Sequence, residues 1–289
     1  MSYVLAKSLK DAAEFLSAEP EKVTILAGGT DLMVFDRDCI RKNPVLDISG
    51  VAEMRRIQLQ DHQLSIGSVT TYRDAILSPL TRRYASALVE ASQRTGSTQI
   101  RNVGTLGGNV VNASPAGDAL VALVALEAQV EIVYGLKSYR QGVGAFLKGP
   151  KKTDLPVNHL LTRLLIPVHE GYVGSSFYKL VNRASNQHGL AISVVSAAAV
   201  VKLSKDKSRL EWARLALGAV APTPVRALQS EEILRERPLS RDLLREAAEA
   251  AVQAIAPIDD VRATAAYRRK VVPAIAENVL ADALRKAGH

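Results

Sequence analysis

Hydrophobic and polar positions alternate with strand and helix periods through the first 170 residues. Residues 1–50 predict, in order, a strand, a helix, a strand, a loop, a helix or turn, and a strand. Helical spacing marks Leu9–Leu16, and Val45–Ile48 is a short apolar strand. The remaining elements predicted in this part are a strand over Gln63–Val69, a helix over Leu80–Gln93, a buried apolar helix over Asp118–Leu126, and β-type runs over Gln129–Tyr134 and Leu160–Ile166.

The last third of the chain has a different order of predicted elements, with strands first and helices after them. Three β-type runs follow one another over Phe177–Val181, Ile192–Leu203 and Leu210–Val220, joined by turn-like connections. Strands in succession favour an antiparallel sheet, because parallel neighbours need long crossovers. Helical spacing begins at Glu231, and Val271–Ala287 predicts a final helix.

The chain length fits two or three packed units. Its 289 residues are 47% hydrophobic, which is typical of a globular protein. The patterns predict an α+β fold with units at 1–50, 51–170 and 175–289. No apolar run reaches about 18 residues, and the first residues lack a leader pattern, so a cytoplasmic location is expected.

Charge and cysteine content exclude several classes of function. The formal net charge is +8, but the basic pairs are scattered and have no aromatic residues between them. This pattern indicates a solvated surface or a docking face for an acidic partner and argues against nucleic-acid binding. Cys39 is the only cysteine, so the chain can form no internal disulfide and no cysteine-ligated iron–sulfur cluster. The five histidines lack metal-ligand spacing, and no metal site is predicted.

The stretch Gln99–Leu120 carries the clearest chemical signal. It contains the pair Gly107-Gly108 between Thr105 and Asn109. Glycine lets a backbone approach a ligand closely, and successive N–H groups can form a nest for an anion. This combination suits a pyrophosphate, although most such pairs are ordinary turns.

A second glycine pair lies in Leu26–Met33, which reads LAGGTDLM and follows the apolar run Val23–Leu26. Two glycine loops after β-type segments would clasp an extended, phosphate-containing ligand from two sides. Neither pair is a G-x-G-x-x-G opening a helix, and neither is followed by the Gly-Lys-Ser/Thr of a P-loop.

Four sequence blocks together resemble one family. They are AGGTDLM at 27–33, IRNVGTLGGNVVNASPAGD at 100–118, ARLALGAVAPTPVR at 213–226 and IDDVRATAAYRR at 258–269. The chain resembles the FAD-binding (medium) subunit of molybdenum hydroxylases of the xanthine dehydrogenase and carbon monoxide dehydrogenase type. The resemblance implies a two-part FAD-binding α/β domain of the p-cresol methylhydroxylase type, with subdomains at 1–55 and 56–172. It also implies a carbon monoxide dehydrogenase flavoprotein-like C-terminal domain at 173–289, with a three-stranded antiparallel sheet and helices.

The resemblance also implies noncovalent FAD and a set of contacting residues. Asp118 would bind a hydroxyl of the ribose or ribityl chain, or else serve only as a helix N-cap. Lys179 would stabilise reduced flavin, or else be a surface lysine on an edge strand. Ile100 would pack on the ring, or else serve the core. The full implied set is Leu26, Ala27, Gly28, Gly29, Thr30, Asp31, Leu32, Met33, Ile100, Thr105, Leu106, Gly107, Gly108, Asn109, Asp118, Leu161 and Lys179.

The implied function is electron transfer, with no catalytic residue on this chain. A large molybdopterin-binding subunit would oxidise the substrate, a small subunit with two [2Fe-2S] clusters would relay electrons, and FAD would pass them to NAD, a quinone, oxygen or a carrier. Two alternatives are a stand-alone flavin-dependent oxidoreductase of the same fold and a flavin-free structural subunit. The segment Ser185–Gly189 departs from the family pattern and leaves the acceptor open, and the substrate is set by another chain.

Overall fold

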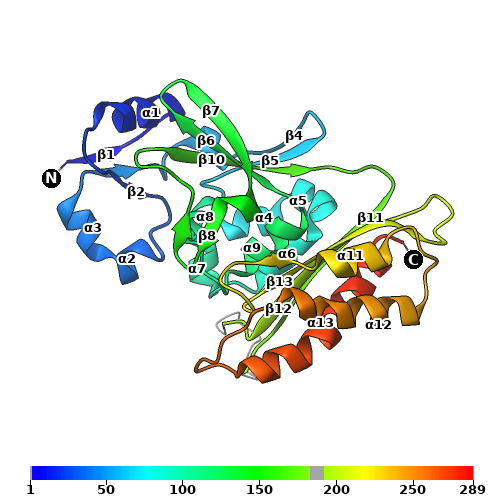
Figure 1. The fold of residues 1–289 in the computed structure, drawn as a ribbon. Helices are drawn as coiled ribbons and strands as arrows, with labels where there is room; N and C mark the ends of the chain where they lie inside the picture. The colour runs from blue at the N-terminus through cyan, green and yellow to red at the C-terminus, as the bar shows by residue number, and fades with distance from the viewer. Residues whose placement is uncertain (1, 183–191, 289) are drawn as a thin grey trace.

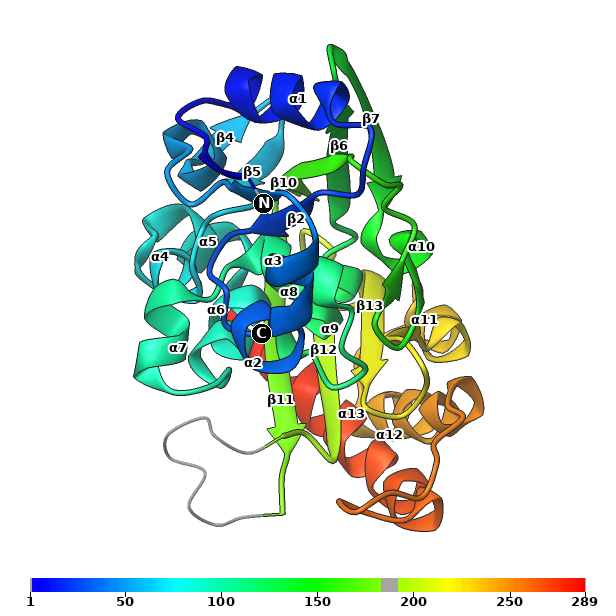
Figure 2. The same ribbon diagram turned by 90° about the vertical axis from the view of Figure 1, so that its left-hand side faces the viewer.

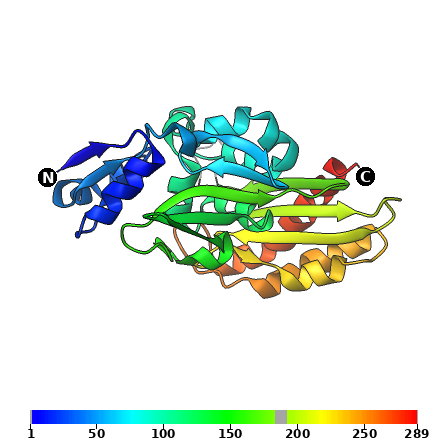
Figure 3. The ribbon, with the colours of Figure 1, turned by 90° about the horizontal axis from the view of Figure 1, so that it is seen from above.

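The computed structural model describes residues 2–182 and 192–288. Its N-terminal unit has the predicted order of elements, and its three strands form a parallel sheet in the order β1-β3-β2. Helix α1 begins after Ser8, whose side chain and Asp11 form a reciprocal capping box. This unit forms one end of the elongated molecule (Figure 3). Its elements are β1 (Tyr3–Leu5), α1 (Leu9–Ala18), β2 (Thr24–Leu26), α2 (Leu32–Phe35), α3 (Arg37–Lys42) and β3 (Val45–Asp47).

A five-stranded antiparallel sheet in the order β4-β5-β10-β6-β7 follows, with its helices beneath it in Figure 1. The predicted helix over Leu80–Gln93 is two helices, because the backbone at Ala85 leaves the helical region (φ −144°, ψ 49°). The elements are η1 (Ala52–Arg55), β4 (Ile57–Gln60), β5 (Gln63–Gly67), α4 (Tyr72–Leu77), α5 (Pro79–Tyr84), α6 (Ser86–Gln93), α7 (Thr98–Val103), α8 (Leu106–Asn112), α9 (Asp118–Ala125), β6 (Gln129–Tyr134), β7 (Lys137–Gly142), α10 (Val143–Phe146), β8 (Leu147–Gly149), β9 (Lys152–Thr153) and β10 (Leu160–Pro167).

The predicted antiparallel sheet of the last third is confirmed and gains a short fourth strand. It runs in the order β11-β12-β13-β14, formed by Tyr172–Leu180, Val195–Leu203, Leu210–Gly218 and Val225–Arg226. Helices cover both faces, which is why β12 is apolar at nearly every position. Ala198 and Val200 pack toward α6 and α9, whereas Ala197 and Ala199 belong to the core formed with the C-terminal helices.

The chain ends in helices stacked on the outer face of this sheet (Figures 1 and 2). The elements are α11 (Leu228–Leu234), α12 (Arg241–Ala250), η3 (Ala251–Ala254) and α13 (Ala265–Lys286). The last helix begins six residues before the predicted Val271, because Thr264 caps it by accepting from the Tyr267 N–H, and it continues through Pro273. In the described residues, no helix combines the length and apolarity needed to cross a membrane.

Candidate FAD-binding site

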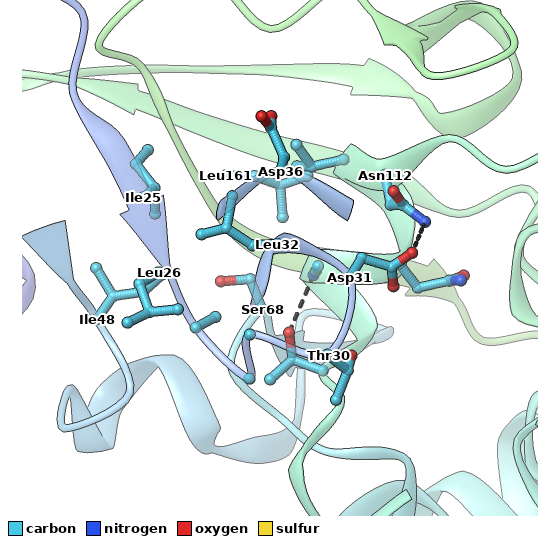
Figure 4. Close-up of a pocket in the computed structure, with 18 of the residues that line it drawn as sticks. Ile25, Leu26, Thr30, Asp31, Leu32, Asp36, Ile48, Ser68, Asn112 and Leu161 are labelled. Atoms are coloured by element: carbon cyan, nitrogen blue, oxygen red, sulfur yellow. Dashed lines mark hydrogen bonds between the residues drawn. The ribbon is translucent and has the colours of Figure 1, made fainter. Parts of the chain in front are cut away.

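A cavity of about 550 Å³ lies between the loop after β2, helix α8 and strand β10 (Figure 4). The two glycine pairs are more than 75 residues apart in the sequence, and the fold brings both to this one cavity. Its lining residues are Ile25, Leu26, Ala27, Gly28, Gly29, Thr30, Asp31, Leu32, Phe35, Asp36, Ile48, Ser68, Tyr72, Thr105, Gly107, Gly108, Asn109, Val111, Asn112, Lys151, Leu155, Leu160 and Leu161.

The first glycine pair lies in an open turn between β2 and α2. Gly29 has φ +67°, in the left-handed region that favours glycine. Among the described residues, no group accepts a hydrogen bond from the five backbone N–H groups of 28–32. Unpaired backbone N–H groups in succession, at the start of a short helix, form a site for an anion. The prediction of an anion nest fits this loop.

The second glycine pair is not the loop that the sequence predicted. Gly107 and Gly108 are in the first turn of α8, which follows another helix, α7, and has Thr105 as its N-cap. The N–H of Gly107 donates to Ser68 O (2.9 Å), and that of Gly108 donates to Thr105 Oγ1 (3.0 Å). Leu106 and Asn109 also donate their N–H groups within the protein. The amides of this pair are therefore already used.

Close packing explains why glycine is needed at Gly107. A Cβ placed there would lie 2.5 Å from Ser68 Cβ and 2.6 Å from Ser68 O. A Cβ at Gly28 would likewise lie 2.1 Å from the carbonyl oxygen of Val103. Gly28 thus allows the N-terminal unit to approach the end of α7, and Gly107 allows α8 to approach Ser68, just after strand β5.

Two buried side-chain atoms at the cavity have no hydrogen-bond partner among the described residues: Ser68 Oγ and Asn109 Oδ1. Buried polar atoms normally have partners, because an unmet one costs about 1–3 kcal/mol. An oxygen-rich ligand with hydroxyl groups would supply both donors and acceptors to these atoms. The open amides at 28–32 and these two orphaned atoms together fit FAD.

Electrostatics at the cavity mouth come from three side chains. Asn112 Nδ2 donates to Asp31 Oδ1 (2.8 Å; Figure 4), and Lys151 Nζ donates to Asn112 Oδ1 (2.5 Å). The Lys151 ammonium is also 3.6 Å from Asp31 Oδ1. Deeper in the cavity, burial and then the carboxylates of Asp118 and Asp31 raise the pKa of Tyr72, so its hydroxyl stays protonated.

Asp118 and Lys179 lie outside the lining residues and bind each other. Lys179 Nζ is 2.7 Å from Asp118 Oδ2 and also donates to Arg94 O. Ser193 donates to Asp118 Oδ1 (2.6 Å). Burial raises the pKa of the Asp118 carboxyl, and the charge and hydrogen bond of Lys179 oppose this shift.

Both alternatives considered for this pair are wrong. Gly117, not Asp118, is the N-cap of α9, and Lys179 is 4% exposed and therefore no surface lysine, although β11 is an edge strand. Contact of Asp118 and Lys179 with flavin stays a prediction.

Two family models match the chain. The FAD binding domain in molybdopterin dehydrogenase matches residues 1–169, and the CO dehydrogenase flavoprotein C-terminal domain matches residues 176–283. The chain belongs to this family. The family resemblance drawn from the four sequence blocks is confirmed, and the chain is an FAD-binding subunit of an oxidoreductase.

Relatives agree over nearly the whole length. A putative xanthine dehydrogenase FAD-binding subunit of Escherichia coli is 31% identical over 99% of this chain and 97% of its own length. The glyceraldehyde dehydrogenase medium chain of Sulfolobus acidocaldarius is 32% identical over 94% of each chain. A carbon monoxide dehydrogenase structure from Hydrogenophaga pseudoflava has a TM-score of 0.89 at 25% identity, covering 99% of this chain and 98% of its own.

Most of the family-implied set lines the cavity, and five of its members do not: Met33, Ile100, Leu106, Asp118 and Lys179. Sequence reasoning missed Ser68, Asn112 and Lys151. Lys151 belongs to the basic pair Lys151-Lys152, whose sequence pattern indicates only a charged surface. The folded structure places Lys151 at the cavity. The departure at Ser185–Gly189 lies outside the described residues. Within the described residues, no three His, Cys, Asp or Glu side chains gather as a metal site.

Proposed function

We propose that the chain is the electron-transferring FAD subunit of a heteromeric molybdenum hydroxylase, and that FAD binds in the cavity between loop 26–32, α8 and β10. The single observation that carries the proposal is the run of five N–H groups at 28–32 that have no acceptor among the described residues, in a loop that lines the same cavity as the unpartnered oxygens of Ser68 and Asn109. When bound, FAD would serve as an electron carrier between one redox centre and another.

The chain's own residues divide the work of holding such a ligand. The amides of 28–32 would donate to the diphosphate, and Ser68 Oγ and Asn109 Oδ1 would bind hydroxyl groups or ring edges. Leu160 and Leu161 present an apolar wall suited to a planar ring. Asp118, Lys179 and Ile100 are proposed to serve the flavin end. All these contacts are proposed to be noncovalent.

The FAD-binding region is proposed to be of the p-cresol methylhydroxylase type, with two subdomains divided between residues 55 and 56. The C-terminal domain is proposed to begin at residue 173.

The chain needs partners because its single cysteine cannot hold an iron–sulfur cluster. The proposed partners are a large molybdopterin-binding subunit, which oxidises the substrate, and a small subunit with two [2Fe-2S] clusters. The basic excess of +8 would help to attract an acidic partner, and salt would weaken that attraction. The acceptor stays open among NAD, a quinone, oxygen or a carrier, and the cytoplasmic location stays a prediction.

Co-expression of the three chains tests the proposal. We expect them to co-purify and the flavin of the complex to be bleached on addition of the substrate, whereas the isolated chain stays yellow. Acid precipitation should release all the yellow colour into the supernatant. Ordinary turnover of a substrate by the isolated chain with an external acceptor would favour the stand-alone flavoenzyme. A colourless chain that cannot be reconstituted would favour the flavin-free subunit.

A further inference from the structure

We infer that the positive charge of Lys151 offsets the carboxylates that line the FAD cavity and so allows a diphosphate to bind there. The same charge determines how strongly the cavity prefers anionic ligands. This inference rests on the proposed function, because it concerns the phosphate end of the same cavity. It adds a specificity-determining residue that the two glycine motifs do not contain.

The backbone fixes Lys151 at the cavity. The residue occupies the turn of the β8–β9 hairpin with φ +58°, and its N–H donates to Ala113 O (3.0 Å), just beyond the end of α8. Ala113 itself is left-handed (φ 46°) and ends that helix. The turn therefore directs the Lys151 side chain back along α8 toward Asn112 and Asp31.

The charges around the cavity are unfavourable to an anion without this lysine. Among the described residues that line the cavity, Lys151 is the one cation, and the other charged residues are Asp31 and Asp36. A bound diphosphate would face two carboxylates, and the neutral amides of 28–32 offer only partial positive charge. The ammonium of Lys151 balances Asp31 and extends the positive potential of the nest.

The ammonium is held in place by several weak contacts. It binds Asn112 Oδ1, lies near Asp31, and is 5.9 Å from the centre of the Phe35 ring. The side chain of Lys151 is 56% exposed, so solvent screens its charge and makes its effect dependent on salt. Its removal should therefore weaken FAD binding only about threefold, without unfolding the protein.

The test compares Lys151→Gln with the matched control Lys152→Gln in the full chain. Lys152 is the next residue, is exposed in β9, and does not line the cavity. We expect the dissociation constant of FAD, measured by quenching of flavin fluorescence, to rise about threefold in Lys151→Gln and to stay unchanged in Lys152→Gln. The dependence of that constant on salt should become weaker in Lys151→Gln, and Lys151→Arg should restore both properties.

Equal FAD affinity in Lys151→Gln and Lys152→Gln would overturn the inference. So would a weakened Lys151→Gln variant whose salt dependence matches that of the native chain, since a lost packing contact rather than a lost charge would then explain it. Failure of the native chain to bind FAD at all would instead overturn the proposed function.

Discussion

The two glycine pairs look alike in the sequence and do different work in the structure. At Gly28-Gly29 the chain turns, one glycine is left-handed, and the following amides have no acceptor in the part of the chain that the structure describes. At Gly107-Gly108 the chain is helical, and the amides are already bonded to Ser68 and Thr105. The first pair offers hydrogen-bond donors to a ligand, whereas the second lets a helix pack closely against the wall of the same cavity.

This difference shows that a glycine pair alone does not identify a phosphate site. What decides is whether the neighbouring backbone has partners of its own. In the second pair, the carbonyl oxygen of Ser68 accepts from the Gly107 N–H, and the hydroxyl of the N-cap Thr105 accepts from the Gly108 N–H, so no ligand is needed to satisfy these donors.

The largest expected effect is structural. Gly107→Ala would push a methyl group against the backbone and side chain of Ser68, at 2.5–2.6 Å. We expect the free energy of unfolding to fall by about 2 kcal/mol in denaturant titrations, as in other overpacked sites. The control is Gly144→Ala, another helical glycine, whose added Cβ would meet nothing within 4 Å. Equal loss of stability in both variants would show that close packing does not require glycine at 107.

The next effect concerns the ligand. Gly29→Ala places a side chain at φ +67°, and this backbone conformation costs a non-glycine residue about 1 kcal/mol. The added Cβ would also lie only 3.1 Å from Met33 Cγ. We expect a similar loss of stability in Gly135→Ala, which has φ +56°, has open space around it and does not line the cavity. Only Gly29→Ala should weaken FAD binding in fluorescence titrations. Weakened binding in both variants would mean that general destabilisation, not the shape of the nest, controls affinity.

The sequence predicts those parts of the fold that are determined by residues near one another in the chain. The element order of 1–50 and the antiparallel strands β11–β13 follow from local pattern, because apolar runs of strand length are separated by turn-like segments. The helical state of Gly107 was not predictable from local preference, since glycine disfavours helices and only the Thr105 cap and the packing on Ser68 compensate.

The site shows the same limit. Motifs predicted the stretches 26–33 and 105–109, and all of these residues except Met33 and Leu106 line the cavity. Lys151 and Ser68 carry no motif, and they reach the cavity through a hairpin turn and a strand end that only the folded chain brings there. The pairing of Asp118 with Lys179 likewise joins residues 61 positions apart.

The smallest expected effect on FAD binding comes from a change in the C-terminal domain, which contains neither glycine pair. Although burial acts in the opposite direction, Arg262 and Arg268 lower the pKa of Asp260 in the folded state. A lowered pKa contributes stability above the unfolded pKa of about 4, and this contribution is lost as the pH falls below it.

Chemical denaturation of the native chain and Asp260→Asn at pH 7 and at pH 3 measures this contribution. The difference in free energy of unfolding between the two proteins should be about 2 kcal/mol at pH 7, because the buried Arg268 loses its charged partner, and smaller at pH 3, with FAD affinity at pH 7 unchanged. A constant difference at both pH values would contradict the lowered pKa. Loss of FAD affinity would show that the C-terminal domain acts on the cavity.

The most direct test follows the backbone amides of both glycine pairs during one titration. We propose ¹⁵N–¹H TROSY spectra of the flavin-free chain with increasing FAD, and in parallel with inorganic pyrophosphate as the phosphate probe. The account predicts large, saturable shifts of the N–H signals of residues 28–32 with both ligands. The signals of Gly107 and Gly108, whose protons are already bonded to Ser68 and Thr105, should move much less with pyrophosphate. Large pyrophosphate shifts at Gly107 and Gly108 with none at 28–32 would contradict the assignment of the diphosphate to the first glycine pair.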